Sequence, residues 1–332
     1  MAAMLNRRRA IGITAAAAGL ALLPFDHWGA AVAEEVTWQG QALGAPAMLR
    51  IHHHDREHAQ RLVESVAAEV RRLERIFSLY RDDSDLVRLN RQGVLIAPPS
   101  EMVELLQRTR SIWDLSAGKF DPTVQPLWSA YREHFSAPDA DAKGPTTAVL
   151  DAALEGVGFD GVRFDADRIA FSRPGMALTL NGIAQGYITD RIAALLRAGG
   201  IESCLVDIGE TWGAGLRPDG GGWRVGIVDP SGSGQHLDVL EVVDRAVATS
   251  SPSGFVFDAE GRFNHLIDPR NGRSPRRYES ITIVAADATT ADGLSTACSL
   301  MDPGAIEAAI AMLPGTEVHL LEASGRRALL QS

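Results

Sequence analysis

The 332-residue chain is predicted to fold as an α+β, or mixed α/β, protein, and three observations lead to that class. Apolar residues make up 45% of the sequence, which is enough for a sizeable core. Segments with helical spacing of apolar residues alternate with short extended segments. That alternation lacks a strict βαβ rhythm, so a purely parallel sheet is not expected. The length is about twice that of a typical domain, but one large domain accommodates it.

The first half of the chain gives mainly helix signals. Residues 36–52 alternate as one extended segment, and residues 60–77 repeat apolar side chains at a helical period. Asp83 or Ser84 can cap a short helix, and Ser100 is expected to cap the next one. The predicted helices that follow cover 101–116 and 123–135. Residues 136–146 are rich in Ala, Asp, Pro and Gly and are predicted to form a surface loop.

The second half mixes strands and helices. A helix is predicted from near Ile183 to Ala198. The composition of residues 268–275 predicts a turn between two strands. The predicted strands are 202–208, 223–228, 239–249, 263–267, 280–286 and, closing the chain, 317–322. The further predicted helices are 290–301 and 306–312.

Residues 1–33 have the features of an export signal. Arg7, Arg8 and Arg9 precede an apolar run, and Ala31-Val-Ala33 fits a small-x-small cleavage pattern. Consecutive arginines before a mild apolar stretch resemble a twin-arginine signal. We therefore expect a mature chain of residues 34–332 in the periplasm. An uncleaved N-terminal anchor is the alternative, although the apolar run is short for a membrane span.

Charge and cysteine content narrow the possible partners. The formal net charge is -10 at pH 7, and loss of residues 1–33 would make it -12, so nucleic acid is not an expected partner. Only Cys204 and Cys298 are present. Two cysteines do not make a disulfide framework, and both lie in apolar segments, so buried free thiols are expected.

Two segments more than a hundred residues apart carry the clearest chemical signal. Asn181-Gly-Ile-Ala-Gln-Gly-Tyr187 is a glycine-containing turn that enters a helix, and such a helix start can approach an anion. Asp292 and Thr296 are spaced to lie on one face of a second helix. A carboxylate and a hydroxyl, with a backbone carbonyl of the turn, would suit Mg²⁺. Taken alone, Asp292 is more plausibly a first-turn residue that faces the helix dipole, and its pairing with the glycine turn favours the metal site.

Other residues add to this set. His265 precedes a predicted turn and could act as a general base near neutral pH, although a lone histidine is more often structural. Lys119, Phe120, Asp121 and Tyr80 lie where aromatic rings and charges could contact a flat ligand. The sequence contains no Gly-x-Ser-x-Gly elbow, Walker A sequence or CxxC pair.

Six ordered blocks resemble the ApbE family, the FAD:protein FMN transferases, across about residues 40–325. The blocks are Phe77-Ser-Leu-Tyr-Arg-Asp-Asp-Ser-Asp-Leu-Val-Arg-Leu-Asn90, Gly118-Lys-Phe-Asp-Pro-Thr-Val-Gln-Pro-Leu-Trp128, Asn181-Gly-Ile-Ala-Gln-Gly-Tyr187, Val206-Asp-Ile-Gly-Glu210, His265-Leu-Ile-Asp-Pro-Arg-Asn-Gly272 and Ala291-Asp-Gly-Leu-Ser-Thr296. The resemblance implies a single large domain with a central sheet flanked by helices.

The same resemblance implies a Mg²⁺-dependent enzyme that moves FMN from FAD onto a threonine hydroxyl of a periplasmic or membrane-bound flavoprotein and releases AMP. By the family pattern, the metal ligands would be Gly182, Asp292 and Thr296. The FAD site would be lined by Tyr80, Lys119, Phe120, Asp121, Thr179, Gln185, Ile267 and Ser295. His265 stands where the family's suspected base stands.

Several positions depart from the family pattern. Thr179 replaces a usual Asp, Asn181 a usual Gly, and Gln185 a usual Lys or Glu, whereas the metal positions are intact. Two alternative functions are therefore considered beside the transferase: a periplasmic FAD carrier without activity, and a Mg²⁺-dependent FAD pyrophosphatase. Some exported members of the family with twin-arginine-like signals serve respiratory or nitrous-oxide-reductase maturation, and the resemblance makes this chain a candidate for such a role.

Overall fold

The computed structural model describes residues 34–332, so the predicted export signal lies outside the described residues. An eight-stranded sheet runs through the molecule, and every neighbouring pair in it is antiparallel. Its strands, in spatial order, are β1 (Glu34–Ala42), β2 (Ala45–His53), β6 (Cys204–Asp207), β7 (Thr211–Ala214), β10 (Arg245–Ser250), β11 (Tyr278–Ala285), β12 (Glu317–Glu322) and β13 (Arg327–Gln331).

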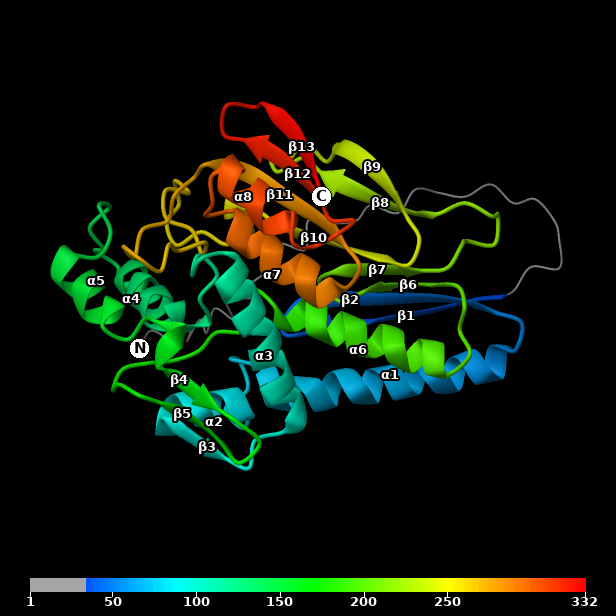
Figure 1. Ribbon diagram of the computed structural model, residues 1–332, viewed down its shortest axis with the longest axis horizontal. Helices are drawn as coiled ribbons and strands as arrows, with labels where there is room; N and C mark the ends of the chain where they lie inside the picture. Colours follow the sequence, from blue (N-terminus) through cyan, green and yellow to red (C-terminus); the bar gives the residue numbers. More distant parts are fainter. Residues whose placement is uncertain (1–33) are drawn as a thin grey trace, which may run out of the picture.

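Three helices cover one face of this sheet: α1 (Arg56–Phe77), α6 (Ala184–Ala198) and α7 (Ala288–Cys298) (Figure 1). The main core lies between them and the sheet, where side chains such as Val70 and Ile192 meet Ile51 and Ile283. These helical residues recur at the period that places them on one face, which is why the helices bury that face. A central sheet flanked by helices in an α+β fold is thus confirmed.

The opposite face of the sheet carries a two-stranded hairpin, β8 (Trp223–Val228) and β9 (His236–Val242). Trp223 and Val225 pack there against Val247 and Val284 of the large sheet. The sheet is therefore the middle layer of the molecule, between a layer of helices and the β8–β9 hairpin.

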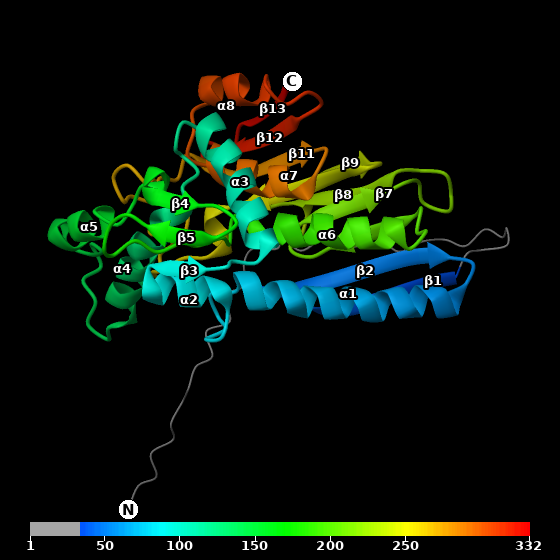
Figure 2. The same cartoon turned by 60° about the horizontal axis from the view of Figure 1, so that its bottom comes forward.

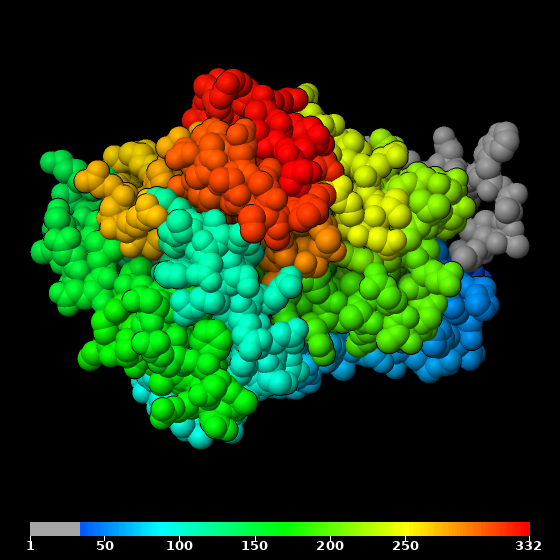
Figure 3. Space-filling model, in the orientation of Figure 1, coloured from blue at the N-terminus to red at the C-terminus, as the bar shows by residue number. Residues whose placement is uncertain are grey.

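One end of the molecule is built from smaller elements (Figure 2). They are α2 (Asp85–Gln92), β3 (Val94–Ile96), β4 (Val162–Phe164), β5 (Arg168–Phe171), α4 (Gln125–Ser136) and α5 (Thr147–Leu154). Helix α3 (Ser100–Leu115) packs against α7. In the space-filling view, α3 lies beside the orange segment, which contains α7 and then α8 (Pro303–Ile310) (Figure 3). Arg108 of α3 forms an ion pair with Asp287 at the start of α7.

Several sequence predictions fail at turns. Residues 36–52 are not one strand but the β1–β2 hairpin, which turns at Leu43 and Gly44 with positive φ at both. Residues 239–249 divide between β9 and β10 at Asp244, whose φ is 51°. The chain does not close at residue 322, because β13 follows. Turns of this kind are short and leave little trace in the pattern of apolar residues.

Residues 263–267 do not form the predicted strand, and only an isolated bridge joins Val256 to Asn264. The Asn264 side chain accepts a hydrogen bond from the Leu266 N–H at 2.9 Å, which diverts the backbone from a regular ladder. Ser100 is also not a cap: Pro99 holds that position, and Ser100 is the first residue of α3. Ser84, in contrast, caps α2 through the Val87 N–H as expected.

Both cysteines are free and buried, as the sequence predicts. Among residues 34–332, no helix has the length and apolar character needed to cross a bilayer.

Candidate active site

A cavity of about 240 Å³ opens where α6 and α7 meet two other segments. These are the loop of residues 252–275 and the turn after α3, which comprises residues 116–121. Segments that are far apart in the sequence supply its walls. Of the predicted site residues, those that line it are Tyr80, Lys119, Phe120, Asp121, Thr179, Gly182, Gln185, His265, Ile267, Asp292 and Thr296. The sequence-based set therefore converges on one place, with one exception described below.

Two glycines allow the start of α6 to approach α7. A Cβ atom on Gly186 would lie 2.2 Å from the carbonyl oxygen of Ala288, and one on Gly182 would lie 2.8 Å from Oγ1 of Thr296. Neither distance is tolerable for a side chain, so the close approach depends on glycine. The Gly186 N–H donates to Oδ2 of Asp292 at 2.9 Å. The turn and the Asp292/Thr296 pair thus form one unit.

The start of α7 is fixed by carboxylates on both sides. Asp190 of α6 accepts hydrogen bonds from the Ala288 and Thr289 N–H groups at 2.7 and 2.8 Å. Asp287 accepts from the Thr290 N–H at 2.8 Å. These bonds satisfy donors that a helix start leaves unpaired. They also hold α7 in the rotation that turns Asp292 and Thr296 toward the cavity.

The cavity floor carries uncompensated acid groups. Burial raises the pKa of Asp292 to about 7; the Asp190 charge adds to this, and the Gly186 N–H opposes it. Burial also raises the pKa of Glu210 well above its usual value, with help from the Asp292 and Asp207 charges. Within residues 34–332, neither Asp292 nor Glu210 takes part in an ion pair. Glu210 had no predicted role, although it is the last residue of a block that carries the family resemblance.

These residues fit a hard divalent cation. Gly182 can offer a carbonyl, Asp292 a carboxylate and Thr296 a hydroxyl, and all three donors are oxygen, as Mg²⁺ prefers. A cation would also favour the ionised form of Asp292, which burial disfavours. In the described part of the chain, no cluster of three or more His, Cys, Asp or Glu could hold a metal ion. The predicted set is not of that kind, because it contains a single carboxylate.

His265 lies in the wall formed by the 252–275 loop. Its Nδ1 lies 3.2 Å from the carbonyl oxygen of Phe255. An acceptor at that position favours the tautomer with hydrogen on Nδ1, which leaves Nε2 as the basic nitrogen. Burial lowers the pKa of His265, and the Phe255 carbonyl partly offsets this. The ring is therefore neutral, and able to accept a proton, at neutral pH.

The turn after α3 presents two charged residues with different roles. Asp121 lines the cavity, but its carboxylate accepts four hydrogen bonds from within the protein: from the N–H and hydroxyl of Thr123, the indole N–H of Trp113 and the N–H of Phe159. It is therefore occupied in shaping the turn. Lys119 extends its ammonium 2.5 Å from Oδ2 of Asp268 in the opposite wall.

Ser295 is the exception to the predicted lining. It is 1% exposed and lies behind the wall, where its hydroxyl meets Oγ of Ser250 at 2.7 Å and the Asp292 carbonyl at 2.9 Å. Ser295 follows Asp292 by three residues on α7, and these two contacts hold its hydroxyl behind the wall. Ser250 takes its place in the lining.

Polar groups at the cavity differ in how fully they are bonded. Gln185 is 6% exposed, and its Nε2 has no partner among the described residues. Asn181 Nδ2 donates to the Tyr80 hydroxyl at 3.0 Å across the mouth. Sequence analysis missed Trp128 and Arg132, which also line the mouth, with the guanidinium 5.3 Å from the indole ring. Their spacing of four residues on α4 is the only signal that could have joined them.

The chain is similar in sequence and in structure to known proteins. Residues 43–320 match the ApbE family. A FAD:protein FMN transferase of Treponema pallidum is 32% identical over 263 residues, covering 72% of this chain and 71% of the relative. Another, from Vibrio cholerae, is 32% identical over 233 residues, 68% of each chain. The solved flavin transferase ApbE from Vibrio cholerae superposes with a TM-score of 0.76 at 26% identity, covering 90% of this chain and 97% of that one.

Proposed function

The chain belongs to the ApbE family, and we propose that it is a Mg²⁺-dependent FAD:protein FMN transferase that links FMN to a threonine hydroxyl and releases AMP. That the protein is an enzyme which transfers flavin from FAD follows from its relatives. The metal, the threonine target and the released AMP are the parts that we propose for this chain.

One observation supports the proposal most strongly: the buried Asp292 carboxylate accepts a hydrogen bond from the Gly186 N–H, and Asp292, Gly182 and Thr296 line one cavity together with His265. A carboxyl group whose pKa burial raises to about 7 is costly to ionise, and such a group is expected where a cation or a charged ligand compensates its charge. Gly182, Asp292 and Thr296 would hold Mg²⁺. When bound, Mg²⁺ would neutralise the charge of the FAD pyrophosphate.

The reaction requires an activated hydroxyl. The threonine oxygen of the acceptor would form a bond to the phosphorus of the FMN half, and the bond from that phosphorus to the oxygen of the AMP phosphate would break. His265 Nε2 would take the hydroxyl proton. AMP would leave with the bridging oxygen as part of its phosphate, so atoms and charge balance. Most of the catalysis would come from positioning and charge neutralisation.

The departures from the family pattern bear on FAD binding rather than on the chemistry. Thr179 carries no charge, and its hydroxyl accepts from the Asn181 N–H at 3.4 Å. Gln185 offers an unpaired, buried amide donor in the cavity. We propose that this amide bonds the nucleotide, because a buried donor without a partner is costly and is satisfied when a ligand arrives.

We further propose that the protein works in the periplasm on a periplasmic or membrane-bound flavoprotein. The basis is the sequence of residues 1–33, with its three arginines, apolar run and Ala31-Val-Ala33.

One experiment tests the function against its alternatives. Purified protein is incubated with FAD, Mg²⁺ and a flavoprotein that accepts FMN on threonine. The transferase yields covalent flavin on the acceptor, seen by in-gel fluorescence, together with AMP. Free FMN and AMP without labelled acceptor would identify a pyrophosphatase. Bound but intact FAD would identify a carrier. An Asp292→Ala sample serves as the matched control.

A further inference from the structure

We propose that the Lys119–Asp268 ion pair holds the loop of residues 252–275 against the turn after α3, and thereby sets the position of His265. Lys119 is then a positioning residue that acts through Asp268, and it does not grip the nucleotide. The catalytic consequence rests on the proposed function, whereas the effect on the loop does not.

The loop needs such a tie because it lacks regular structure. Residues 255–275 contain no strand, and one isolated bridge joins the two arms of the loop. Few ladder bonds therefore fix the backbone that carries His265. At its outer end an aromatic cluster packs Phe257 and Phe263 against Tyr131 of α4. That cluster anchors the tip and leaves the cavity side to other contacts.

The contacts on the cavity side concentrate around Asp268. Its Oδ2 lies 2.5 Å from Nζ of Lys119, its Oδ1 accepts from the Arg270 N–H at 3.0 Å, and its carbonyl accepts from the Gly272 N–H at 2.9 Å. Arg270 in turn donates to the Ala117 carbonyl at 2.8 Å, beside Lys119 in the chain. Asp268 thus shapes its own turn and joins it to the segment of residues 117–119.

The other side of the bridge is rigid. The Lys119 turn is braced by the four hydrogen bonds that Asp121 accepts. The side chains of Lys119 and Asp268 are 19% and 10% exposed, so solvent screens their attraction weakly. Loss of either partner would leave a nearly buried charge without compensation. The Lys119–Asp268 ion pair therefore joins a well-braced turn to an irregular loop, and breaking the pair is costly.

The consequence falls on His265, three residues before Asp268. Among the described residues, the His265 side chain bonds only to the Phe255 carbonyl, in the other arm of the same loop, so it moves with the loop. General-base catalysis depends on reach to the reacting proton, and a shift of about 1 Å can cost on the order of 10²-fold in rate. A Lys119 that gripped FAD would affect binding instead.

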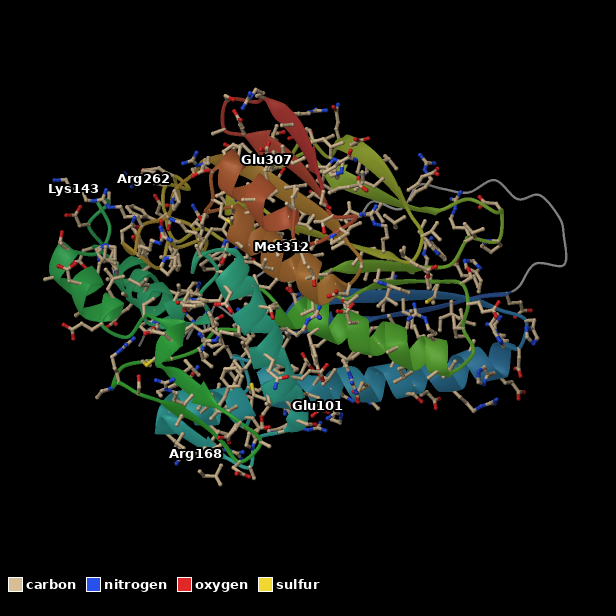
Figure 4. The ribbon with its side chains drawn as sticks, viewed as in Figure 1. Glu101, Lys143, Arg168, Arg262, Glu307 and Met312 are labelled. Atoms are coloured by element: carbon tan, nitrogen blue, oxygen red, sulfur yellow. The ribbon has the colours of Figure 1, made fainter. Side chains whose placement is uncertain are left out.

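The test is a double-mutant cycle of Lys119→Met, Asp268→Asn and both changes together. Asn at 268 retains the acceptor for the Arg270 N–H and loses the charge and the carboxylate oxygen that face Lys119. Arg262→Met is the matched control, because Arg262 pairs with Asp258 at 3.0 Å in the same loop but at its outer end, near Lys143 of the neighbouring loop (Figure 4). Turnover number and KM for FAD are measured at saturating Mg²⁺, together with deuterium uptake of residues 263–268.

We expect each single change to lower the turnover number by about 10-fold, with KM for FAD little altered. The double variant should be no worse than the worse single variant, because both changes break one contact. Uptake at 263–268 should quicken in all three and not in Arg262→Met. A raised KM in Lys119→Met alone, or additive losses, would overturn the proposal. If wild-type protein transfers no FMN, the proposed function fails, and the exchange data still decide whether the pair holds the loop.

Discussion

Asp292 is buried and has little electrostatic compensation within the described part of the chain. It is 3% exposed, and among the described residues its carboxylate accepts one hydrogen bond, from the Gly186 N–H. The Asp190 charge raises the pKa of Asp292, and the Asp292 charge raises that of Glu210. A surplus of buried carboxylate at the floor of a cavity is therefore the clearest residue-level sign of function in this chain.

Asp292→Asn is predicted to separate stability from activity. An acid whose pKa is near 7 in the folded chain and about 4 when unfolded contributes stability at low pH that is lost as the pH rises between those values. Without metal at pH 8 the variant should therefore melt at a higher temperature than wild type, by roughly 2–4 °C for each kcal/mol gained. Thermal melts at pH 5 and pH 8 measure this.

The same variant should lose its response to Mg²⁺. Mg²⁺ should raise the melting temperature of the wild type at pH 8 and leave Asp292→Asn unchanged, and transfer should fall to background. A variant that is still stabilised by Mg²⁺ would place the cation elsewhere.

His265 is predicted to give the transfer rate a rising pH limb. Burial lowers its pKa below the ordinary value of about 6.5, and only the neutral ring accepts a proton. The rate at saturating FAD should therefore rise with pH, and the midpoint of that rise should lie below about pH 6.5. His265→Gln should lose that limb together with about 10²- to 10⁴-fold of rate, while the dissociation constant for FAD changes little. If the rate holds and the affinity falls, His265 is a binding residue instead.

At the scale of elements, the site depends on how closely α6 and α7 cross. Helical glycines at a contact allow backbones to approach, and here the carbonyl of Ala288 occupies the space that a Cβ atom of Gly186 would need. Asp190 and Asp287 then fix the start of α7. The distance between Gly182 and Thr296 is thus set by helix packing and not by either residue alone.

Gly186→Ala is predicted to push α6 from α7 and destabilise the protein by about 1–3 kcal/mol. Gly304→Ala is the matched control: it is also helical, in the first turn of α8, and a Cβ there meets only Oδ1 of Asp302 at 3.7 Å. That change should be neutral or stabilise by up to about 1 kcal/mol. Urea unfolding of both variants measures the difference. Equal stability of the two variants would show that the helices can separate without cost.

At the scale of the whole molecule, the cavity lies between two parts of the structure that pack together beside the antiparallel sheet. Helices α6 and α7 lie on the sheet, whereas the 252–275 loop and the turn after α3 belong to the end built from α4, α5 and the small strands (Figure 2). The cavity forms at their junction. A ligand there would contact both parts, and the Lys119–Asp268 pair already joins them.

The mature chain is predicted to begin near Glu34 and to act without the first 33 residues. Protein expressed as residues 34–332 should fold and transfer FMN like the full chain. N-terminal sequencing of the exported protein should give Glu34 first, and replacement of Arg7, Arg8 and Arg9 by lysine should leave precursor in the cytoplasm. Protein found in the cytoplasm with Met1 retained would contradict the prediction.

Local sequence signals were sufficient to predict several helices, one helix cap and many residues of the site. Apolar spacing located α1, α6 and α7, a side-chain oxygen marked the cap at Ser84, and the short ordered blocks contained many of the residues that line the cavity. These are local signals, because helical periods, caps and motifs are written within a few residues. The same locality explains the errors at Asp244 and at residues 263–267, where a turn or one side-chain bond decided the backbone.

The contacts and the electrostatic coupling between site residues could be read only from the tertiary structure. It turned Ser295 away from the cavity, occupied Asp121 with internal hydrogen bonds, and added Glu210 and the pairing of Lys119 with Asp268. Burial, charge coupling and contacts between residues some 150 positions apart depend on how complete elements pack. No window of sequence contains that information, because the energies belong to neighbours that the chain supplies from elsewhere.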